Sequence, residues 1–392
     1  MGAGAVKMEI AWWDLDGSPA TTEDLARQLC EDGAVDDWRA VVGLREKFWI
    51  ADRDGNRWGA VMVWNDERPS ELPENRAAEL IGRPVTHRDR FEVLAAVRGT
   101  GSAGGPNGSH PYVVIDAFAD EPLRGNPVAV FFDADDLTGS QMQRIAQEMN
   151  LSEVTFLLAP TGDADVRVRI FTPVNELPFA GHPLLGTAVA VALDRRADRL
   201  CFETAMGVVP FAIDRAPGDG PGAGRAHASM EQPIPVWGPY EHTDALLSAL
   251  GIASSTLPVE IYRNGPRHVF VGLPDTEALS ALRPDHRALA AFPDMAANCF
   301  APDGERWRAR MFSPAYGVVE DAATGSAAGP LAIHLARHGV VEYGKTVEIH
   351  QGVELGRHSV MFAEATLGET GEIARVQVSG HGAVVAEGTI HV

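Results

Sequence analysis

The sequence predicts an α+β protein of three domains, and three observations lead to that prediction. Residues 169–183 and 310–326 repeat one pattern, in which an extended Arg-x-Phe-[Thr/Ser]-Pro segment turns into a glycine-led helix. Six of the eight tryptophans lie within the first 64 residues. Between these regions, residues 99–109 are all small or turn-forming, which is typical of a flexible linker. We therefore expect a small N-terminal module, residues 1–98, and two similar C-terminal halves, residues 110–228 and 229–392.

The N-terminal module has the element order of a ferredoxin-like domain. Turn residues, N-caps and apolar alternation predict strands and helices in the order β-α-β-β-α-β. The strands are expected at residues 8–15, 44–50, 58–64 and 91–97, and the helices at residues 22–32 and 71–81. The tryptophans are expected in the core of this module.

The same module resembles the small dimeric α+β-barrel families that include cofactor-free mono-oxygenases of the YdhR type. The resemblance rests on the element order and on the hairpin around Trp58-Gly59. The module has one histidine, His87, and a lone histidine is more often a surface residue than a catalyst. We expect a dimerisation or accessory role, with mono-oxygenase activity as the alternative.

Composition and charge favour a small-molecule substrate. A net charge of -21 and a pI near 5.0 disfavour binding to nucleic acid or to an anionic membrane, since both need a basic protein surface. Cys30, Cys201 and Cys299 are too far apart to suggest a disulfide framework or a zinc site. The chain shows no dinucleotide fingerprint, phosphate loop or apolar run of the ~20 residues that span a bilayer. We expect a cytoplasmic protein that uses no metal and no cofactor.

The first C-terminal half opens with two strands and a helix. The strands are expected at residues 112–118 and 128–132, around turn residues at 124–127. The following helix has N-cap candidates at residues 138–140 and should end at Asn150. Glu153 then lies where this helix meets the next strand. A carboxylate at such a junction is more often a solvated cap than a catalyst, and both readings stay open.

The two repeated loops bring polar side chains to the starts of glycine-led helices. Pro183 suits the first turn of a helix, so His182 is expected at its mouth, where the helix dipole lowers the imidazole pKa. His182 could equally be an N-cap. In the second loop Asp321 could act in catalysis or hold the loop, and Pro330 is expected within the first helical turn. Two such helix starts facing one cleft would bind a carboxylate with unpaired N–H groups.

Together these motifs resemble the PhzF family of phenazine biosynthesis. The similar runs are residues 150–153, 169–187, 264–272 and 312–330, and the resemblance covers nearly all of residues 110–392. It implies a diaminopimelate-epimerase-like fold, in which two halves each wrap a curved sheet around a central helix, and usually a homodimer. The N-terminal extension is a departure, because typical members lack it.

The resemblance also implies an activity, the isomerisation of trans-2,3-dihydro-3-hydroxyanthranilate. Glu153 would be the general acid/base, with His182 and Asp321 assisting it, and the substrate would be bound by Ser152, Gly181, Gly325 and Ser326. One carboxylate would take a proton from C3 of the ring and return it to C1, with no metal, nucleotide or flavin. With this activity, residues 1–98 would add a second dimer contact or bind another enzyme of phenazine biosynthesis as a partner.

Two alternatives stay open. One is a two-base racemase or epimerase acting on a small amino acid, for which Ser326 is a weak second acid or base. The other is a non-catalytic ligand-binding scaffold that uses the same cleft.

Overall fold

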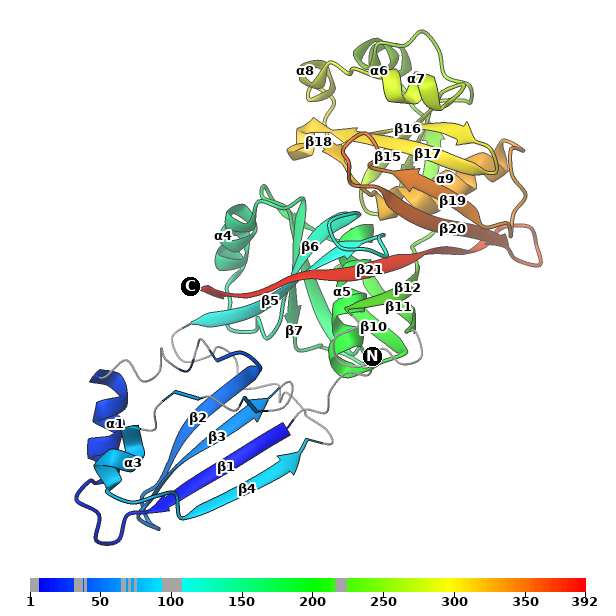
Figure 1. The fold of residues 1–392 in the computed structure, drawn as a ribbon. Helices are drawn as coiled ribbons and strands as arrows, with labels where there is room; N and C mark the ends of the chain where they lie inside the picture. The colour runs from blue at the N-terminus through cyan, green and yellow to red at the C-terminus, as the bar shows by residue number, and fades with distance from the viewer. Residues whose placement is uncertain are drawn as a thin grey trace. The chain divides into compact units, whose positions relative to one another are not determined.

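The computed structural model describes residues 7–31, 38, 41–64, 68–69, 72–73, 76–93, 108–215 and 224–392. The chain divides into two compact units, residues 1–99 and 100–392, and each is described by itself (Figure 1). Residues 99–107 of the expected linker lie outside the described residues, as do residues 94–97 of the expected last N-terminal strand. No helix among the described residues is long and apolar enough to cross a membrane.

The N-terminal unit is a four-stranded antiparallel sheet with helices. Its described elements follow the expected β-α-β-β-α-β order, and the sheet order is β2-β3-β1-β4. They are β1 Lys7–Asp14, α1 Thr22–Glu31, β2 Leu44–Asp52, β3 Arg57–Trp64, α3 Arg76–Ile81 and β4 His87–Glu92.

The last strand of this unit begins earlier than expected. The apolar residues after Phe91 suggested a strand at 91–97, but β4 begins at His87 and its sequence, HRDRFE, is almost wholly polar and exposed. Such a strand has no apolar alternation, so its pairing with β1 could not be recognised from the sequence.

The core of the unit lies between the sheet and the helices. It contains four buried tryptophans, as expected of this tryptophan-rich region; Trp12 and Trp49 are only partly buried. The buried four are Trp13, Trp38, Trp58 and Trp64. Because β1 alternates, its residues Met8, Ile10 and Trp12 lie on the opposite face of the sheet from Ala11 and Trp13.

The C-terminal unit contains two α+β halves joined in one continuous 17-stranded sheet. The first half contains two long helices and eight strands. They are β5 Ser109–Ala117, β6 Asn126–Phe131, α4 Gly139–Met149, β7 Glu153–Leu158, β8 Val166–Phe171, β9 Glu176–Leu177, α5 Gly181–Arg195, β10 Arg199–Thr204, β11 Gly207–Asp214 and β12 Arg225–Glu231.

The second half repeats the plan with more helices. It contains β13 Val236–Pro239, α6 Thr243–Leu250, β14 Glu260–Arg263, β15 Arg267–Gly272, α7 Thr276–Ala281, α8 His286–Leu289, β16 Ala296–Asp303, β17 Arg306–Ser313, a 3-10 turn Pro314–Tyr316, β18 Val318–Asp321, α9 Gly325–Arg337, β19 Val347–Gln351, β20 Ser359–Leu367 and β21 Ile373–His391.

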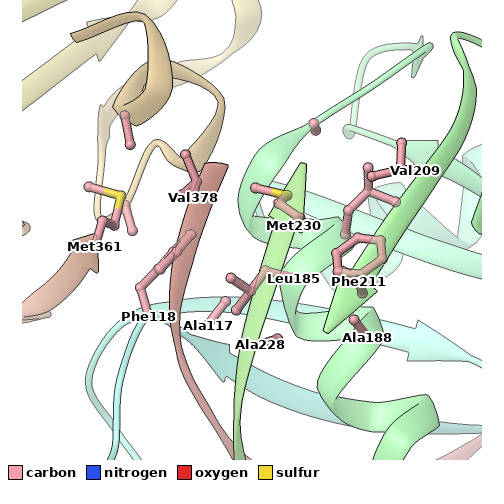
Figure 2. Close-up of a cluster of buried hydrophobic side chains, with 14 of the residues drawn as sticks. Ala117, Phe118, Leu185, Ala188, Val209, Phe211, Ala228, Met230, Met361 and Val378 are labelled. Atoms are coloured by element: carbon pink, nitrogen blue, oxygen red, sulfur yellow. The ribbon is translucent and has the colours of Figure 1, made fainter. Parts of the chain in front are cut away.

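Each half is built around one buried helix. Residues 181–192 of α5 and 325–335 of α9 are all buried, which small and aliphatic side chains on every face make possible. One apolar cluster runs across both halves: Phe118, Met361 and Val378 lie on one side, and Leu185, Met230 and Phe211 on the other (Figure 2). The shared core makes the halves one compact unit.

The final strand belongs to both halves. β21 pairs with β20 of the second half, and further along with β12 and β5 of the first half. Figure 1 shows it as one long strand running from one half to the other. A single residue number therefore does not separate the halves.

The expectation for Pro330 is wrong. Helix α9 starts at Gly325, so Pro330 is its sixth residue and lies beyond the first turn. A proline there leaves the carbonyl of Ser326 without its helical N–H partner. The side chain of Asn264 supplies the missing donor, because its Nδ2 lies 2.9 Å from that carbonyl oxygen.

Candidate active site

The N-termini of the two central helices meet face to face. A Cβ on Gly181 would lie 2.2 Å from the backbone nitrogen of Ser326. A Cβ on Gly325 would lie 2.7 Å from the ring of Phe118 and 3.0 Å from the backbone nitrogen of His182. Only glycine fits at either position, so the repeated glycines allow the two helix starts to touch.

Neither of these helix starts has a side-chain cap. Ala180 is the N-cap of α5, and Thr324, the N-cap of α9, makes no cap hydrogen bond. The Thr324 hydroxyl instead donates to Oδ2 of Asp321, at 2.7 Å. The N–H groups of both first turns, together with the positive ends of both dipoles, are thus suited to bind an anion such as a carboxylate.

Glu153 is the first residue of β7, beside these helix starts. Helix α4 positions it: a capping box at Thr138 starts the helix, and Asn150 ends it in a left-handed conformation, as the sequence predicted. The Glu153 side chain is 15% exposed, and its Oε2 is buried without a hydrogen-bond partner. Burial, and then the nearby charge of Asp321, raise the pKa of Glu153 to about 8, against a hydrogen bond from Ser152. The solvated-cap reading does not fit this environment.

His182 lies against Glu153. It is the second residue of α5, so the N-cap reading is wrong. Its Nε2 is 3.4 Å from Oε2 of Glu153 and 3.4 Å from the Ser152 hydroxyl. Burial lowers the pKa of His182 to about 3, so the imidazole is neutral. With Glu153 protonated at neutral pH, the two side chains form a pair of neutral groups instead of an ion pair.

Asp321 approaches the same place from the second half. Its Oδ1 accepts a hydrogen bond from Nδ2 of Asn126 at 2.7 Å, and its Oδ2 accepts from Thr324. Burial raises the pKa of Asp321 to about 6, although the hydrogen bonds from Thr324 and Asn126 act in the opposite direction. Asp321 does hold its loop, as one reading of the sequence expected, and it also lies close enough to Glu153 to raise the pKa of that carboxyl.

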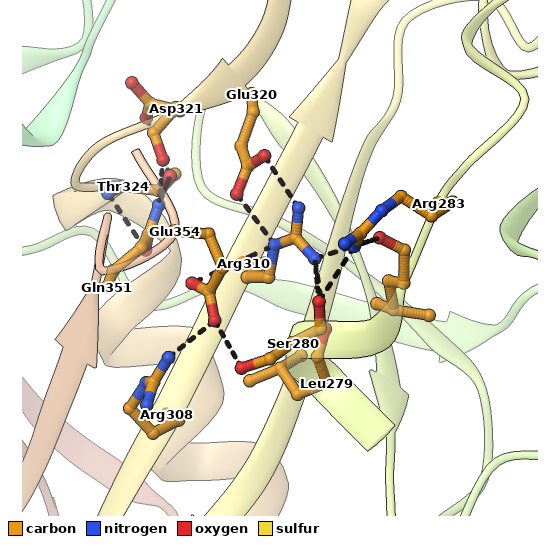
Figure 3. A network of polar contacts seen from close by, with 11 residues as sticks. Leu279, Ser280, Arg283, Arg308, Arg310, Glu320, Asp321, Thr324, Gln351 and Glu354 are labelled. Carbon is orange, nitrogen blue, oxygen red and sulfur yellow. Dashed lines mark hydrogen bonds and ion pairs between the residues drawn. The ribbon is translucent and has the colours of Figure 1, made fainter. Parts of the chain in front are cut away.

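A buried polar network supports Asp321 from behind (Figure 3). Nε2 of Gln351 donates to the Asp321 carbonyl and to the Thr324 hydroxyl, both at 2.9 Å. The neighbouring Glu320 is bound by Arg310 through Nε at 2.8 Å and Nη2 at 2.9 Å. Arg310 therefore neutralises a second carboxylate that would otherwise stand unpaired beside Asp321.

The expected site residues thus come together, but sequence reasoning missed three others. Asn126, Thr324 and Gln351 all bond to the catalytic candidates. The signal for Asn126 was present: residues 124–127 read Arg-Gly-Asn-Pro, and residues 263–266 of the second half read Arg-Asn-Gly-Pro. Pairing the two turns as part of the duplication would have marked both asparagines. Gln351 carries no such signal.

Metal-ligand and thiol groups lie outside this cluster. Among the described residues, one group has metal-compatible spacing, Glu260 with His334 and His338. Its carboxylate already bonds to Arg337, at 2.6 Å, so the group reads as an ion-pair network. Cys201 is half-buried in β10 and Cys299 is buried in β16. The side chain of Cys30 lies outside the described residues.

Known proteins are similar to this chain in sequence and in fold. The family model PhzC-PhzF, described as phenazine biosynthesis-like protein, matches residues 115–388. A trans-2,3-dihydro-3-hydroxyanthranilate isomerase of Pseudomonas aeruginosa is 64% identical over 279 residues, covering 71% of this chain and 98% of its own.

Solved structures of other proteins have a similar fold. A PhzF-family phenazine biosynthesis protein of Bacillus anthracis superposes with a TM-score of 0.62 at 24% identity, covering 72% of this chain and 99% of its own. A predicted epimerase of Pseudomonas aeruginosa superposes with a TM-score of 0.60 at 31% identity, with the same two coverages.

Proposed function

The chain belongs to the PhzC-PhzF family, and from that premise we propose that residues 110–392 are an isomerase acting on trans-2,3-dihydro-3-hydroxyanthranilate in phenazine biosynthesis. The isomerase of Pseudomonas aeruginosa is matched over 98% of its length at 64% identity, which supports the same activity here. The observation that carries the mechanism is the buried carboxyl of Glu153, which lies against His182, within reach of the charge of Asp321 and beside two uncapped helix starts.

The helix starts are suited to hold the substrate. The N–H groups around Gly181 and around Gly325-Ser326 would bind the substrate carboxylate, since the positive ends of α5 and α9 converge there. Ser152, His182 and Asp321 offer hydrogen bonds to the hydroxyl and the amine of the ring. The diaminopimelate-epimerase-like arrangement of the halves is part of this proposal.

Glu153 would carry the proton. In its ionised form it takes the proton from C3; the electrons of that C–H bond move through the diene, and the protonated carboxyl returns the proton to C1. The resulting enol becomes the ketone 6-amino-5-oxocyclohex-2-ene-1-carboxylate. C1 and C3 flank the same amine-bearing carbon, so one carboxyl above one ring face reaches both. A raised pKa suits a group that must both accept and donate near neutral pH.

The two rival readings have less support. A two-base epimerase commonly uses two thiols, yet neither helix start carries a cysteine, and Cys201 and Cys299 lie in β10 and β16. Burial raises the pKa of Cys299 to about 12, which makes it a poor nucleophile or base. A pure ligand-binding scaffold would have no need of a buried carboxyl in which one oxygen, Oε2 of Glu153, lacks a hydrogen-bond partner, because burying such an oxygen is destabilising.

One incubation separates the three readings. Purified protein is mixed with trans-2,3-dihydro-3-hydroxyanthranilate and a small amino acid in deuterium oxide, and the diene absorbance, the product and the α-hydrogen of the amino acid are followed. An isomerase consumes the diene, an epimerase leaves it and exchanges an α-hydrogen of an amino acid, and a scaffold only binds. Persistence of the diene with active-site binding intact would overturn the proposal. Prior treatment with a chelator or a thiol-alkylating reagent should leave the rate unchanged.

For the N-terminal unit we propose a ferredoxin-like accessory module that contributes a homodimer contact. The sheet face opposite its buried tryptophans carries Met8, Ile10, Trp12, Phe48 and Phe91, of which Phe48 is 50% exposed and Phe91 46% exposed. A second copy of the same sheet would cover these side chains. The alternative roles are docking to a neighbouring phenazine-pathway enzyme and mono-oxygenase activity. A cytoplasmic location is also a proposal, supported by the free thiols of Cys201 and Cys299.

Excision tests that module. Residues 1–98 produced alone should sediment as a dimer and consume no oxygen with phenazine precursors. A monomer, or oxygen uptake that depends on the precursor, would overturn the accessory role.

A further inference from the structure

Asn126 is a buried amide held in place by both halves of the C-terminal unit. It begins β6 and is 3% exposed. Gly125 precedes it with a φ of +67°, and a Cβ there would lie 2.4 Å from the carbonyl oxygen of Ala117, so the turn needs glycine. From the second half, Nε of Arg357 donates to the Gly125 carbonyl at 3.0 Å, and the Gly125 N–H donates to the carbonyl of His358 at 3.1 Å. The amide is therefore fixed from two sides.

The amide nitrogen of Asn126 faces three acceptors with two hydrogens. It lies 2.7 Å from Oδ1 of Asp321, 3.0 Å from the carbonyl of Ala323 and 3.2 Å from Nδ1 of His182. The amide oxygen accepts from the Ser152 hydroxyl at 3.3 Å. The reverse orientation would set that oxygen against a carboxylate and a carbonyl, so the network determines which end is the nitrogen.

A donor facing Nδ1 of His182 determines the tautomer of the ring. Asp321 and Ala323 lie closer to the two amide hydrogens than Nδ1 does, but an amide nitrogen cannot accept a hydrogen bond, so a proton on Nδ1 would have no acceptor there. Nδ1 therefore presents a lone pair, and the neutral imidazole carries its proton on Nε2. Nε2 is the atom that lies 3.4 Å from Glu153 and 3.4 Å from Ser152. We propose that Asn126 is a positioning residue that holds His182 with its proton on Nε2, aimed at the reacting carboxyl.

This arrangement has a chemical use. The N–H at Nε2 can donate a hydrogen bond to Glu153 whenever that carboxyl is ionised. This hydrogen bond stabilises the Glu153 carboxylate, which is the form that removes a proton from the substrate ring. The opposite tautomer would present a lone pair to a carboxylate. Because the same amide binds Asp321, one side chain aligns a group from each half. The kinetic consequence rests on the proposed isomerase function, whereas the tautomer does not.

The second half contains a matched pair outside the site. Nδ2 of Asn298 lies 3.3 Å from Nδ1 of His268 and donates to the carbonyl of Ala296 at 3.0 Å. Both residues are buried, and burial lowers the pKa of His268 to about 3, as for His182. Asn298→Ala is therefore the control for removing an amide from a buried histidine.

The test observes the ring directly. Full-length protein labelled with 15N-histidine is examined by two-bond proton–nitrogen correlation, and the His182 signals are assigned with His182→Gln. Wild-type His182 should carry its proton on Nε2; Asn126→Ala should populate both tautomers, and Asn298→Ala should change His268 alone. A proton on Nδ1 of wild-type His182, or an unchanged His182 in folded Asn126→Ala, would overturn the proposal. The wild-type spectrum alone shows which nitrogen of His182 carries the proton, so the proposal is tested even if Asn126→Ala does not fold.

A kinetic arm adds a second readout. Asn126→Ala should lower kcat about 100-fold with little change in KM, since the substrate-binding helix starts are untouched. Asn126→Asp keeps the shape of the side chain, but the new carboxyl can donate a hydrogen bond only while it is protonated. The acidic groups near it are Glu153 and Asp321; Glu320 is already paired with Arg310. Its activity should fall as the new carboxyl ionises, and a wild-type pH profile for this variant would contradict the proposal. An inactive wild type would instead refute the isomerase assignment and leave the tautomer result standing.

Discussion

The two halves of the C-terminal unit repeat one framework but differ in how they bury their charges. In the first half Arg169 binds Glu176 through two hydrogen bonds at 2.7 and 2.8 Å, with side chains 24% and 42% exposed. In the second half Arg310 binds Glu320 with nearly the same geometry, but the side chains are 7% and 12% exposed. Each arginine lies 5.0 Å from the ring of the phenylalanine two residues later. The salt bridge was therefore duplicated with the fold.

The two halves therefore contribute differently to the site and to stability. The first half keeps its salt bridge at the surface and contributes Ser152, Glu153 and His182 to the site. The second half contributes Asp321 to the site and buries its salt bridge directly behind that residue. Removing the Glu153 carboxyl should accordingly damage the chemistry, whereas removing the Arg310 guanidinium should damage stability.

The sharpest test of the first half is Glu153→Gln. The amide keeps the shape but cannot carry the proton, so kcat should fall by at least about 10²–10⁴-fold while substrate affinity is kept. Steady-state rates and equilibrium binding measure the two separately. Turnover close to that of the wild type in the glutamine variant would refute the one-base mechanism.

The matching test of the second half is Arg310→Ala compared with Arg169→Ala. Breaking the buried pair leaves Glu320 charged and unpaired, which should lower the free energy of unfolding by about 3–5 kcal/mol. Breaking the exposed pair should cost about 0.2–1 kcal/mol. Urea unfolding followed by circular dichroism gives both values. Equal losses would mean that burial does not distinguish the halves.

The pH dependence of stability should also depend on the first half. The pKa of Glu153 is raised to about 8 in the folded state from 4.5, so folded protein holds a proton that unfolded protein has lost. Between those pH values its contribution to stability falls as pH rises, by up to about 1.4 kcal/mol per pH unit. Glu153→Gln should remove this decline, so its advantage over wild type should grow from pH 5 to 8. A constant difference across that range would contradict the raised pKa.

Asp321→Asn tests the coupling between the halves. The charge of Asp321 helps to raise the pKa of Glu153, so the asparagine variant should ionise Glu153 at lower pH. If the ionised form removes the ring proton, kcat/KM of the wild type rises with pH towards about 8, and the rise should begin at lower pH in Asp321→Asn. The residual activity of the variant is followed from pH 5 to 9, with Thr324→Val as a control that keeps the charge. A rise at unchanged pH would show that the two carboxyls do not interact.

The smallest effect is expected from removing the N-terminal unit and the linker. Protein that starts at Gly108 keeps β5 and its pairing with β21, so it should fold and isomerise at close to the full-length rate. A soluble, folded but inactive protein would make the N-terminal unit part of the catalyst.

Local signals predicted much of this molecule. The helix from Thr138 to Asn150 and the two glycine-led helices follow from caps, proline and apolar spacing, which act within a few residues. The repeated segments also pointed to His182 and Asp321 and to their glycine neighbours, whereas Glu153 was marked by the PhzF-like run of residues 150–153. The family resemblance, and not hydrophobic periodicity, predicted the role of Glu153, because a carboxylate at the end of a helix is ambiguous by itself.

What the sequence did not show depends on distant pairing. The polar strand β4 is recognised only through β1, and Pro330 is tolerated only because Asn264 reaches Ser326. Gln351 bonds to Asp321 from 30 residues away, and Asn126 bonds to it across 195. No local rule reports such contacts, and these are the residues that orient the site.

The long strand β21 has a consequence for how the protein is made. His391 pairs with Ser109, so the edge of the first half is completed by a strand that lies far along the chain and is made much later than β5. During synthesis the first half must wait with β5 unpaired on that side, whereas the N-terminal unit already has all four strands once residue 92 has emerged. Folding of such non-local pairs is slow, and open strand edges invite aggregation. Loss of residues 383–391 would therefore leave most of β5 unpaired along this edge, although none of the contacts described at the site involves those residues.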